Sequence, residues 1–215
     1  MAKISYKKIS YIKKLYYRDL FSMKKIAENL DVSIDAVVYF MRKYDLKRRK
    51  PSENEKIKFA KKPLSFKIKT NLSQKEKELK TIAVALYWGE GYKSKKATNV
   101  DFANSDTEMI KIFLKFLRKI CNIDESKLRI YLYCYDNQNP KYLIKYWSKI
   151  TRVPIYRFTK PYVRKDFRLE KKGKMKYGLI HVRYYDKKLL LLILDWIDQY
   201  RQTCVGTQAV NEVGL

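Results

Sequence analysis

One stretch of the chain decides how its larger part folds: Thr81-Ile-Ala-Val-Ala-Leu-Tyr-Trp-Gly-Glu-Gly91. Small residues recur in it every fourth position, at Thr81, Ala85 and Gly89. Residues four apart lie on one face of a helix, and a face of small side chains lets a second helix approach closely. The pattern therefore predicts that two copies of the chain pack through these three residues.

Glu90 stands at the end of this helix, between Gly89 and Gly91. A carboxylate is unfavourable at a helix C-terminus, because that end already carries negative partial charge. If two copies of the helix pack together, two such carboxylates converge, and a divalent cation between them would remove their repulsion. Mg²⁺ suits the position, since it takes carboxylate, phosphate and water oxygens. We therefore predict a metal ligand at Glu90, the alternative being an exposed carboxylate between flexible glycines.

The composition indicates a polyanionic partner. Lys and Arg number 49 against 22 Asp and Glu, which gives the 215 residues a formal net charge of +27. Both residues 1–72 (20 basic, 7 acidic) and residues 73–202 (29 basic, 14 acidic) carry this excess. The 46% hydrophobic content is too high for a disordered basic tail. Nucleic acid is thus the expected partner, rather than a small-molecule substrate.

Other classes of protein are excluded by what the sequence contains. Three cysteines without a Cys-x-x-Cys pair and one histidine cannot form a zinc finger. The longest apolar run, residues 189–194, is far shorter than the roughly 18–20 residues of a spanning helix. We expect a cytoplasmic protein that associates with the nucleoid through DNA and not with a membrane.

Residues 1–50 have the periodicity of three short helices. Ser22 and Ser33 can cap helices over 23–30 and 34–44, with a short turn at Asp31 between them. This is the spacing of a helix-turn-helix, although a generic three-helix bundle is an alternative. The segment resembles the helix-turn-helix of the resolvase/invertase type, with Asp in place of the usual Gly at the turn. Asp tolerates the left-handed backbone that such a turn needs.

The third helix of this domain would enter a major groove, and the basic arm at 47–50 would follow phosphates or a narrow minor groove. Residues 51–72, with two prolines and many lysines, are expected to form a solvated linker. The expected DNA contacts in this part of the chain are Asp35, Tyr39, Arg42, Lys47, Arg48 and Arg49.

Residues 73–202 predict an α+β domain. Residues 73–76 form a capping box that starts the helix ending at Glu90. Residues 128–135 alternate strictly between apolar and basic or aromatic side chains, and 177–185 form another strand. Helices are expected over 140–150 and 187–200. The tail, 203–215, has no periodicity and is expected to be disordered.

The stretch Ala83-Val-Ala-Leu-Tyr-Trp-Gly-Glu-Gly91 resembles the nine-residue motif of the LAGLIDADG homing endonucleases. Tyr177-Gly-Leu-Ile-His-Val-Arg-Tyr-Tyr-Asp186 and the Leu-rich segment after it are similar to the family's last strand and helix. The resemblance covers roughly residues 73–200. It implies an αββαββα saddle that straddles DNA, and metal-binding motif carboxylates that serve phosphodiester hydrolysis. Only Glu90 matches the metal-binding acid.

The chain departs from this family in four ways. Trp88 replaces the first acid of the motif, and Ala83 replaces its leading Leu. The segment after the motif is too short for a full first hairpin, and an additional helix at 140–150 interrupts the second half. Since the chain has one motif, an active site would need a homodimer, which would also pair two helix-turn-helix domains on a pseudo-palindromic DNA site.

The second domain supplies further candidates. Lys176, just before the last strand, is a candidate catalytic residue that would polarise the attacked phosphate or the water. His181 is interpreted as a DNA-facing strand residue rather than a general base. The expected DNA contacts of this domain are Lys93, Lys95, Lys96, Arg129, Tyr131, Tyr133, Arg157, Arg164, Lys165, Arg168, His181 and Arg183.

The sequence thus predicts a site-specific, double-stranded-DNA-binding homing-type endonuclease that is homodimeric and depends on Mg²⁺. The alternative is a helix-turn-helix transcription regulator that uses the same saddle without catalysis. An RNA-binding, maturase-like protein fits the charge and the tyrosine-rich strands, but the helix-turn-helix argues against it. A membrane-surface protein would need an amphipathic helix with a free apolar face.

Overall fold

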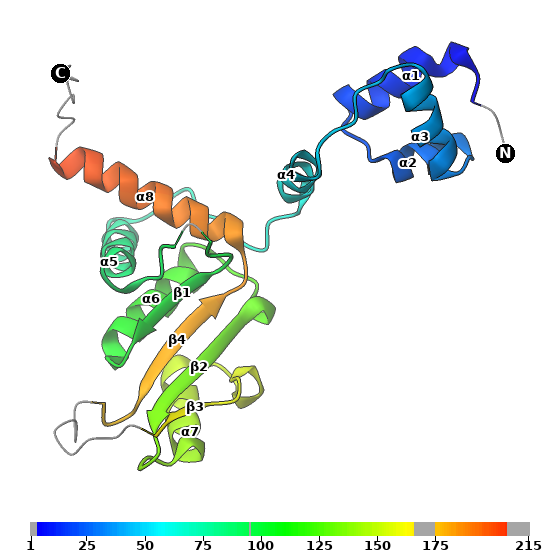
Figure 1. The fold of residues 1–215 in the computed structure, drawn as a ribbon. Coiled ribbons are helices and arrows are strands. Elements are labelled where there is room, and N and C mark those ends of the chain that lie inside the picture. The colour runs from blue at the N-terminus through cyan, green and yellow to red at the C-terminus, as the bar shows by residue number, and fades with distance from the viewer. Residues whose placement is uncertain (1–3, 95, 166–174, 206–215) are drawn as a thin grey trace, which may run out of the picture. The chain divides into compact units, whose positions relative to one another are not determined.

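The computed structural model describes residues 4–94, 96–165 and 175–205. The chain divides into two compact units, an N-terminal unit, Met1–Pro63, and a C-terminal unit, Leu64–Leu215 (Figure 1). The first is helical and the second combines helices with a four-stranded sheet, so the protein is α+β. No helix in the described parts of the chain is both long and apolar enough to cross a membrane.

The N-terminal unit consists of short helices around a small apolar core. Ser22 and Ser33 cap α2 and α3 as predicted, because their hydroxyls accept hydrogen bonds from the amides of Lys25 and Ala36. Asp31 ends α2 in the left-handed conformation, with φ 53°. The elements are η1 (Tyr6–Lys8), α1 (Ile9–Lys13), η2 (Lys14–Arg18), α2 (Met23–Leu30), α3 (Ile34–Lys43) and α4 (Pro51–Lys61).

The segment expected to be a linker, residues 51–72, is structured along much of its length. Pro51 occupies the first turn of α4, where its missing N–H costs nothing, and Glu53 accepts a hydrogen bond from the Lys50 amide at 2.6 Å. The ammonium of Lys61 binds the carbonyls of Asp19 and Leu20, both at 3.1 Å. Proline here starts a helix rather than interrupting the chain.

The C-terminal unit is built around a mixed sheet in the order β1-β4-β2-β3, in which only the β2–β3 pair is parallel. Its elements are α5 (Gln74–Glu90), β1 (Val100–Asn104), α6 (Thr107–Lys119), η3 (Glu125–Lys127), β2 (Leu128–Tyr135), α7 (Pro140–Thr151), η4 (Ile155–Arg157), β3 (Tyr162–Arg164), β4 (Leu179–Tyr184) and α8 (Lys187–Val205). The helix α8 extends beyond the predicted end at 200, and residues 206–215 of the expected tail lie outside the described residues.

The order of these elements differs from the expected αββαββα pattern. A single strand, β1, follows α5, and the partner it would have in a hairpin is reduced to an isolated bridge between Gly91 and Phe102. The short segment between α5 and β1 leaves no room for a full strand. The predicted helix over 140–150 is present as α7, between β2 and β3.

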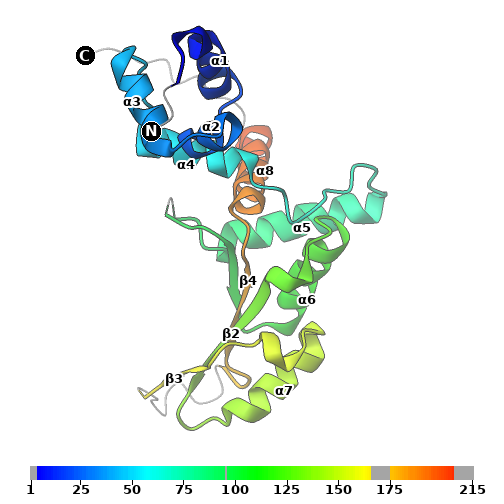
Figure 2. The ribbon, with the colours of Figure 1, turned by 90° about the vertical axis from the view of Figure 1, so that its right-hand side faces the viewer.

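One face of the sheet is covered by α6 and α7, while α5 and α8 lie together near the end of β1 (Figures 1 and 2). Alternate residues of β2 and β4 point into the core beneath α6 and α7, among them Ile130, Leu132, Ile180 and Val182, each at most 1% exposed. The intervening residues form the opposite face, which we call the outer face: Asp101, Ala103, Arg129, Tyr131, Tyr133, His181 and Arg183.

The junction between β4 and α8 is fixed by Asp186, which is 5% exposed. Its carboxylate accepts hydrogen bonds from the amides of Lys188 and Leu189 and from the hydroxyl of Ser65 at 2.5 Å. Burial opposes ionisation, but these hydrogen bonds outweigh it, and the pKa of Asp186 lies below its ordinary value. The residue therefore caps α8 and ties the start of the C-terminal unit to it.

Replacing Asp186 with Ala should lower the free energy of unfolding of the C-terminal unit by about 2–3 kcal/mol, because a helix cap and a buried hydrogen-bond acceptor are both lost. Urea unfolding followed by tryptophan fluorescence measures this, since Trp88, Trp147 and Trp196 all belong to this unit. The depressed pKa stabilises the fold above the unfolded value near 4, so the difference from the wild type should shrink as the pH falls below about 4.

The matched control is Asp195→Ala, an exposed acid of α8 whose carboxylate accepts a hydrogen bond from Gln199. Its effect should stay within about 0.5 kcal/mol. Equal losses in the two variants would contradict a special role for Asp186.

Candidate functional site

A buried carboxylate organises the outer face of the sheet. Asp101 of β1 is 7% exposed, and its two oxygens accept from different side chains of β4. The Nδ1 of His181 lies 2.8 Å from Oδ1, and the Nε of Arg183 lies 2.7 Å from Oδ2. Burial works against the charged form of Arg183, but the neighbouring carboxylate outweighs it and raises the pKa of the guanidinium above its ordinary value.

Strand register explains why these groups meet. Asp101 lies directly opposite Arg183 in the β1–β4 pair, and Arg183 lies directly opposite Arg129 in the β4–β2 pair. The two arginines are like charges on adjacent strands, an arrangement that costs stability unless it is compensated. Asp101 supplies the compensation on one side. The guanidinium of Arg129 donates to the backbone carbonyls of Ser126 and Leu128.

Aromatic rings complete the outer face. The guanidinium of Arg183 lies 4.1 Å from the ring centroid of Tyr131, whose hydroxyl is 2.6 Å from that of Tyr185. The centroid of the Tyr133 ring lies 4.7 Å from that of the His181 imidazole and 5.3 Å from that of Tyr162, with the rings tilted in both pairs. Cations held against aromatic rings form a rigid surface suited to phosphates and to the edges of bases.

Glu90 reaches the same region from the end of α5. Gly91 follows it in a position that no side chain could occupy, because an added Cβ would lie 2.5 Å from the Tyr87 carbonyl oxygen. The Tyr87 hydroxyl donates to the Tyr92 carbonyl and accepts from the Asp101 amide, and burial raises its pKa to about 12. These bonds fix the end of α5 against β1.

A pocket of about 510 Å³ brings these groups together: Glu90, Gly91, Tyr92, Asp101, Ala103, His181 and Arg183 line it. The Glu90 carboxylate is exposed and has no hydrogen bond or ion pair with any described residue. One free carboxylate, one buried carboxylate, an imidazole and a guanidinium thus share an opening at the edge of the outer face. This pocket is the candidate functional site.

Asp101 did not emerge from the sequence as a site residue. It occupies an alternating segment, but nothing in that segment shows which strand pairs with it. The cross-strand register with β4 creates its role, and that register depends on the folded sheet. A single acid within a strand of a very basic chain was the only signal available.

Lys176 does not line this pocket. It is exposed in the turn before β4, with its ammonium 5.3 Å from the Tyr177 ring, whereas His181 and Arg183 lie further along β4 beside Asp101. Within one chain the fold does not bring Lys176 into the pocket, and its role toward the attacked phosphate or the water stays a prediction. Arg183 is a cation that shares the pocket with Glu90, because β1 pairs with residues 180–184 of β4 and places Asp101 opposite Arg183.

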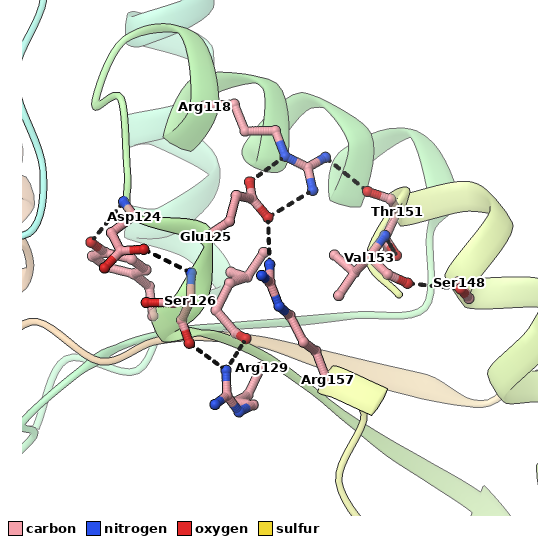
Figure 3. Close-up of polar contacts among 11 residues, drawn as sticks. Arg118, Asp124, Glu125, Ser126, Arg129, Ser148, Thr151, Val153 and Arg157 are labelled. Atoms are coloured by element: carbon pink, nitrogen blue, oxygen red, sulfur yellow. Dashed lines mark hydrogen bonds and ion pairs between the residues drawn. The ribbon is translucent and has the colours of Figure 1, made fainter. Parts of the chain in front are cut away.

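Arg157 is held by other side chains. Its guanidinium contacts Glu125 at 3.3 Å, and the same carboxylate binds Arg118 at 2.8 Å (Figure 3). Arg118 also donates to the Thr151 carbonyl at 2.8 Å. We call Arg118, Glu125 and Arg157 the bracing network, since they connect α6, η3 and η4. Arg157 is thus engaged within the chain, and its expected DNA contact stays a prediction.

In the N-terminal unit, Asp35, Tyr39 and Arg42 are exposed on α3, with Tyr39 60% exposed. Lys47 and Arg48 are also exposed. Arg49 differs, because its guanidinium stacks 4.0 Å over the Tyr16 ring and donates to the Phe21 carbonyl. It therefore braces the unit rather than extending from the basic arm.

The remaining expected contacts fall at several places. Lys93 donates to the Gly91 carbonyl at 2.7 Å, and Lys96 is exposed. Arg164 and Lys165 are exposed on and just after β3. Lys95 and Arg168 lie outside the described residues.

The small residues of α5 face solvent in the single chain. Thr81, Ala85 and Gly89 are all exposed, and a Cβ added at Gly89 would meet nothing within 4 Å. Beside them, Ile82 is 49% and Trp88 37% exposed. The α5 face is thus open at Ala85 and Gly89, whereas Thr81 contacts the Tyr200 hydroxyl and the Trp88 ring lies near the Arg201 guanidinium of α8.

A single chain does not offer a complete metal site among its described residues, since no group of three His, Cys, Asp or Glu side chains is arranged to hold one ion. Both oxygens of Asp101 are already engaged by His181 and Arg183. Glu90 alone remains available. The donor set fits Mg²⁺ only if a second carboxylate or phosphate oxygens complete the coordination.

The chain matches no protein-family model, and comparisons with curated proteins and with solved structures find no significant similarity. Its site must therefore be interpreted from its own residues.

Replacing Glu125 with Ala should lower the free energy of unfolding of the C-terminal unit by about 1–2 kcal/mol, because two partly buried guanidinium groups lose their shared partner. Tryptophan fluorescence in urea measures the loss. The control is Asp198→Ala, which breaks the exposed pair with Arg201 on α8 and should cost less than about 0.5 kcal/mol. If Glu125→Ala lowers the free energy of unfolding as little as Asp198→Ala does, the bracing network contributes no more than an exposed ion pair.

Proposed function

We propose that the protein is a DNA endonuclease of the homing type that acts as a homodimer with a divalent cation. The observation that supports this most directly is the pocket in which a free carboxylate, Glu90, faces the cations of a basic and aromatic sheet face. A polyanion bound on that face would bring a phosphate beside an acid that lacks a partner. Few other functions need a bound phosphate and an unpaired carboxylate in one place.

The chain's own residues would divide the work. Arg183, held by Asp101 and stacked on Tyr131, is positioned to bind a phosphate oxygen without reorganising. Arg129 on the outer face, with the exposed Arg164 and Lys165 at the end of β3, would follow the backbone of the duplex. Glu90 from each copy would hold the cation. Mg²⁺, when bound, would act as a Lewis acid toward the phosphate and stabilise developing charge.

The sheet would serve as a saddle on double-stranded DNA, with the basic and aromatic outer face toward the duplex. The N-terminal unit would act as a helix-turn-helix, since α2 and α3 are joined by a short turn and α3 exposes Tyr39 and Arg42. A homodimer would carry two such units and so favour a pseudo-palindromic site.

A second function is favoured by a specific observation: one chain offers a single available carboxylate at the pocket, with Trp88 where a second acid would stand. A DNA-binding transcription regulator without catalysis would keep the basic face and the N-terminal unit and need no metal. The two functions differ in whether bound DNA is cut.

The variant Glu90→Gln should abolish metal-dependent cutting while leaving DNA affinity within about threefold, because it removes one charge without changing shape. The substrate is a duplex selected for binding from a randomised library, incubated with Mg²⁺ or Mn²⁺ and analysed on a denaturing gel. Glu78→Gln, on the exposed surface of the same helix, is the matched control and should cut like the wild type.

If the wild type binds the selected duplex tightly but cuts it with neither cation, the protein is a regulator rather than an endonuclease. If Glu90→Gln and the wild type cut equally well, the protein is a nuclease but Glu90 is not a ligand of its metal ion.

Changing Ala85 to Glu should convert the dimer to a monomer, because it places a charge in the middle of the open face of α5. Light scattering coupled to gel filtration gives the mass directly. The control is Lys115→Glu at an exposed position of α6, which also introduces a negative charge but should leave the dimer intact. A wild type that stays monomeric even on the selected duplex would refute the shared site.

A further inference from the structure

We propose that His181 is the general base of the cleavage reaction and that Asp101 is its positioning residue. The proposal rests on the proposed endonuclease function and assigns the proton transfer within the same pocket. His181 is the only histidine of the chain, so its role can be measured without ambiguity. The sequence alone favoured a passive, DNA-facing role for it, and the position of Asp101 changes that interpretation.

The geometry orients the imidazole. A carboxylate only accepts hydrogen bonds, so the Nδ1 that lies 2.8 Å from Asp101 must carry a proton. In the neutral ring the other nitrogen, Nε2, then has a free lone pair. The Tyr133 ring packs against it in a tilted arrangement, with the ring centroids 4.7 Å apart, and so restricts its rotation. Nε2 is therefore kept as an acceptor on a side chain that is 21% exposed and lines the pocket.

The second oxygen of Asp101 strengthens this assignment. Arg183 donates to Oδ2 at 2.7 Å, and its guanidinium is always protonated. A carboxylate held by a permanent donor on one oxygen directs the other toward His181. Asp101 is buried and acts through the imidazole, so it does not touch the substrate. This is the orienting arrangement that general bases commonly have.

The groups around the ring are few and come from each neighbouring element. Asp101 faces it from β1, Arg183 adjoins it on β4, and Tyr133 packs on it from β2. Glu90, at the end of α5, and Tyr92 share the pocket. A phosphate bound by Arg183 would therefore lie close to Nε2.

The chemical step is a hydrolysis. Nε2 takes a proton from a water molecule as the water oxygen forms a bond to phosphorus, and the opposite P–O bond to the sugar breaks. The leaving sugar oxygen takes a proton from solvent, and the imidazolium returns its own proton to solvent afterwards. No oxidant or further reactant is needed. General-base catalysis of this kind contributes about 10²–10⁴-fold to a rate.

The first experiment measures the tautomer without any cutting. Nitrogen-15 NMR of labelled protein shows a single imidazole, and the neutral wild-type ring should carry its proton on Nδ1. In Asp101→Asn the amide oxygen must face the Arg183 donor, so the amide NH₂ faces Nδ1 and the proton should move to Nε2. The control Asp195→Asn, exposed on α8, should keep the wild-type tautomer.

The second experiment measures single-turnover cutting of the selected duplex with Mg²⁺. His181→Gln should slow cutting about 10²–10⁴-fold while duplex affinity changes less than about threefold. The wild-type rate, measured across a range of pH, should show a dependence that His181→Gln lacks. Added imidazole should partly restore cutting to His181→Ala but not to Glu90→Gln, a rescue that a purely structural role would not produce.

The outcomes separate this proposal from the function on which it rests. If the wild type cuts and His181→Gln cuts equally fast, His181 is not the base and the endonuclease stands. A wild-type proton on Nε2 would also overturn the proposal. If the wild type cuts no duplex, the endonuclease function fails and the assignment of a base fails with it.

Discussion

The buried carboxylate of Asp101 is the interaction on which the outer face of the sheet depends. Arg183 and Arg129 lie opposite each other on neighbouring strands, and two like charges in that arrangement destabilise a sheet. Asp101 offsets the charge of Arg183 and orders His181 with its second oxygen. Removing the acid would leave Arg183 and His181 without their shared partner, while Arg129 would keep its two backbone acceptors. A sheet face that gathers these cationic groups thus requires one well-placed anion among them.

Local signals gave the elements of the fold reliably. Ser22 and Ser33 cap their helices, Ser73 and Glu76 form a capping box, and the strict alternation of 128–135 corresponds to β2 residue for residue. These features depend on side chains and backbone groups a few residues apart. The helix α4 lies within the segment expected to be a linker, because a proline in the first turn favours a helix.

The site was harder to predict, since it depends on which strands pair and which charges are already engaged. The sequence shows that Arg157, Arg49 and Lys176 are basic. It does not show that Glu125 binds Arg157 or that the Tyr16 ring supports Arg49. The sequence likewise cannot show that β1 pairs with residues 180–184 of β4. Register alone brings Asp101 to Arg183 and leaves Lys176 near the other end of the strand.

The two carboxylates of the pocket have opposite situations, and this difference supports the functional argument. Asp101 is buried and both its oxygens are used, so it can organise side chains but not accept a new ligand. Glu90 is exposed and unpaired among the described residues, in a chain of net charge +27 where cations are abundant. Gly91 and Tyr87 fix its backbone against β1, and Glu90 shares the pocket with Arg183, whose guanidinium binds Asp101 instead. A carboxylate without a partner in the chain is available to bind an external ligand, and the lysines and arginines of the chain do not take that ligand's place. The simplest ligand that also attracts phosphate is a divalent cation.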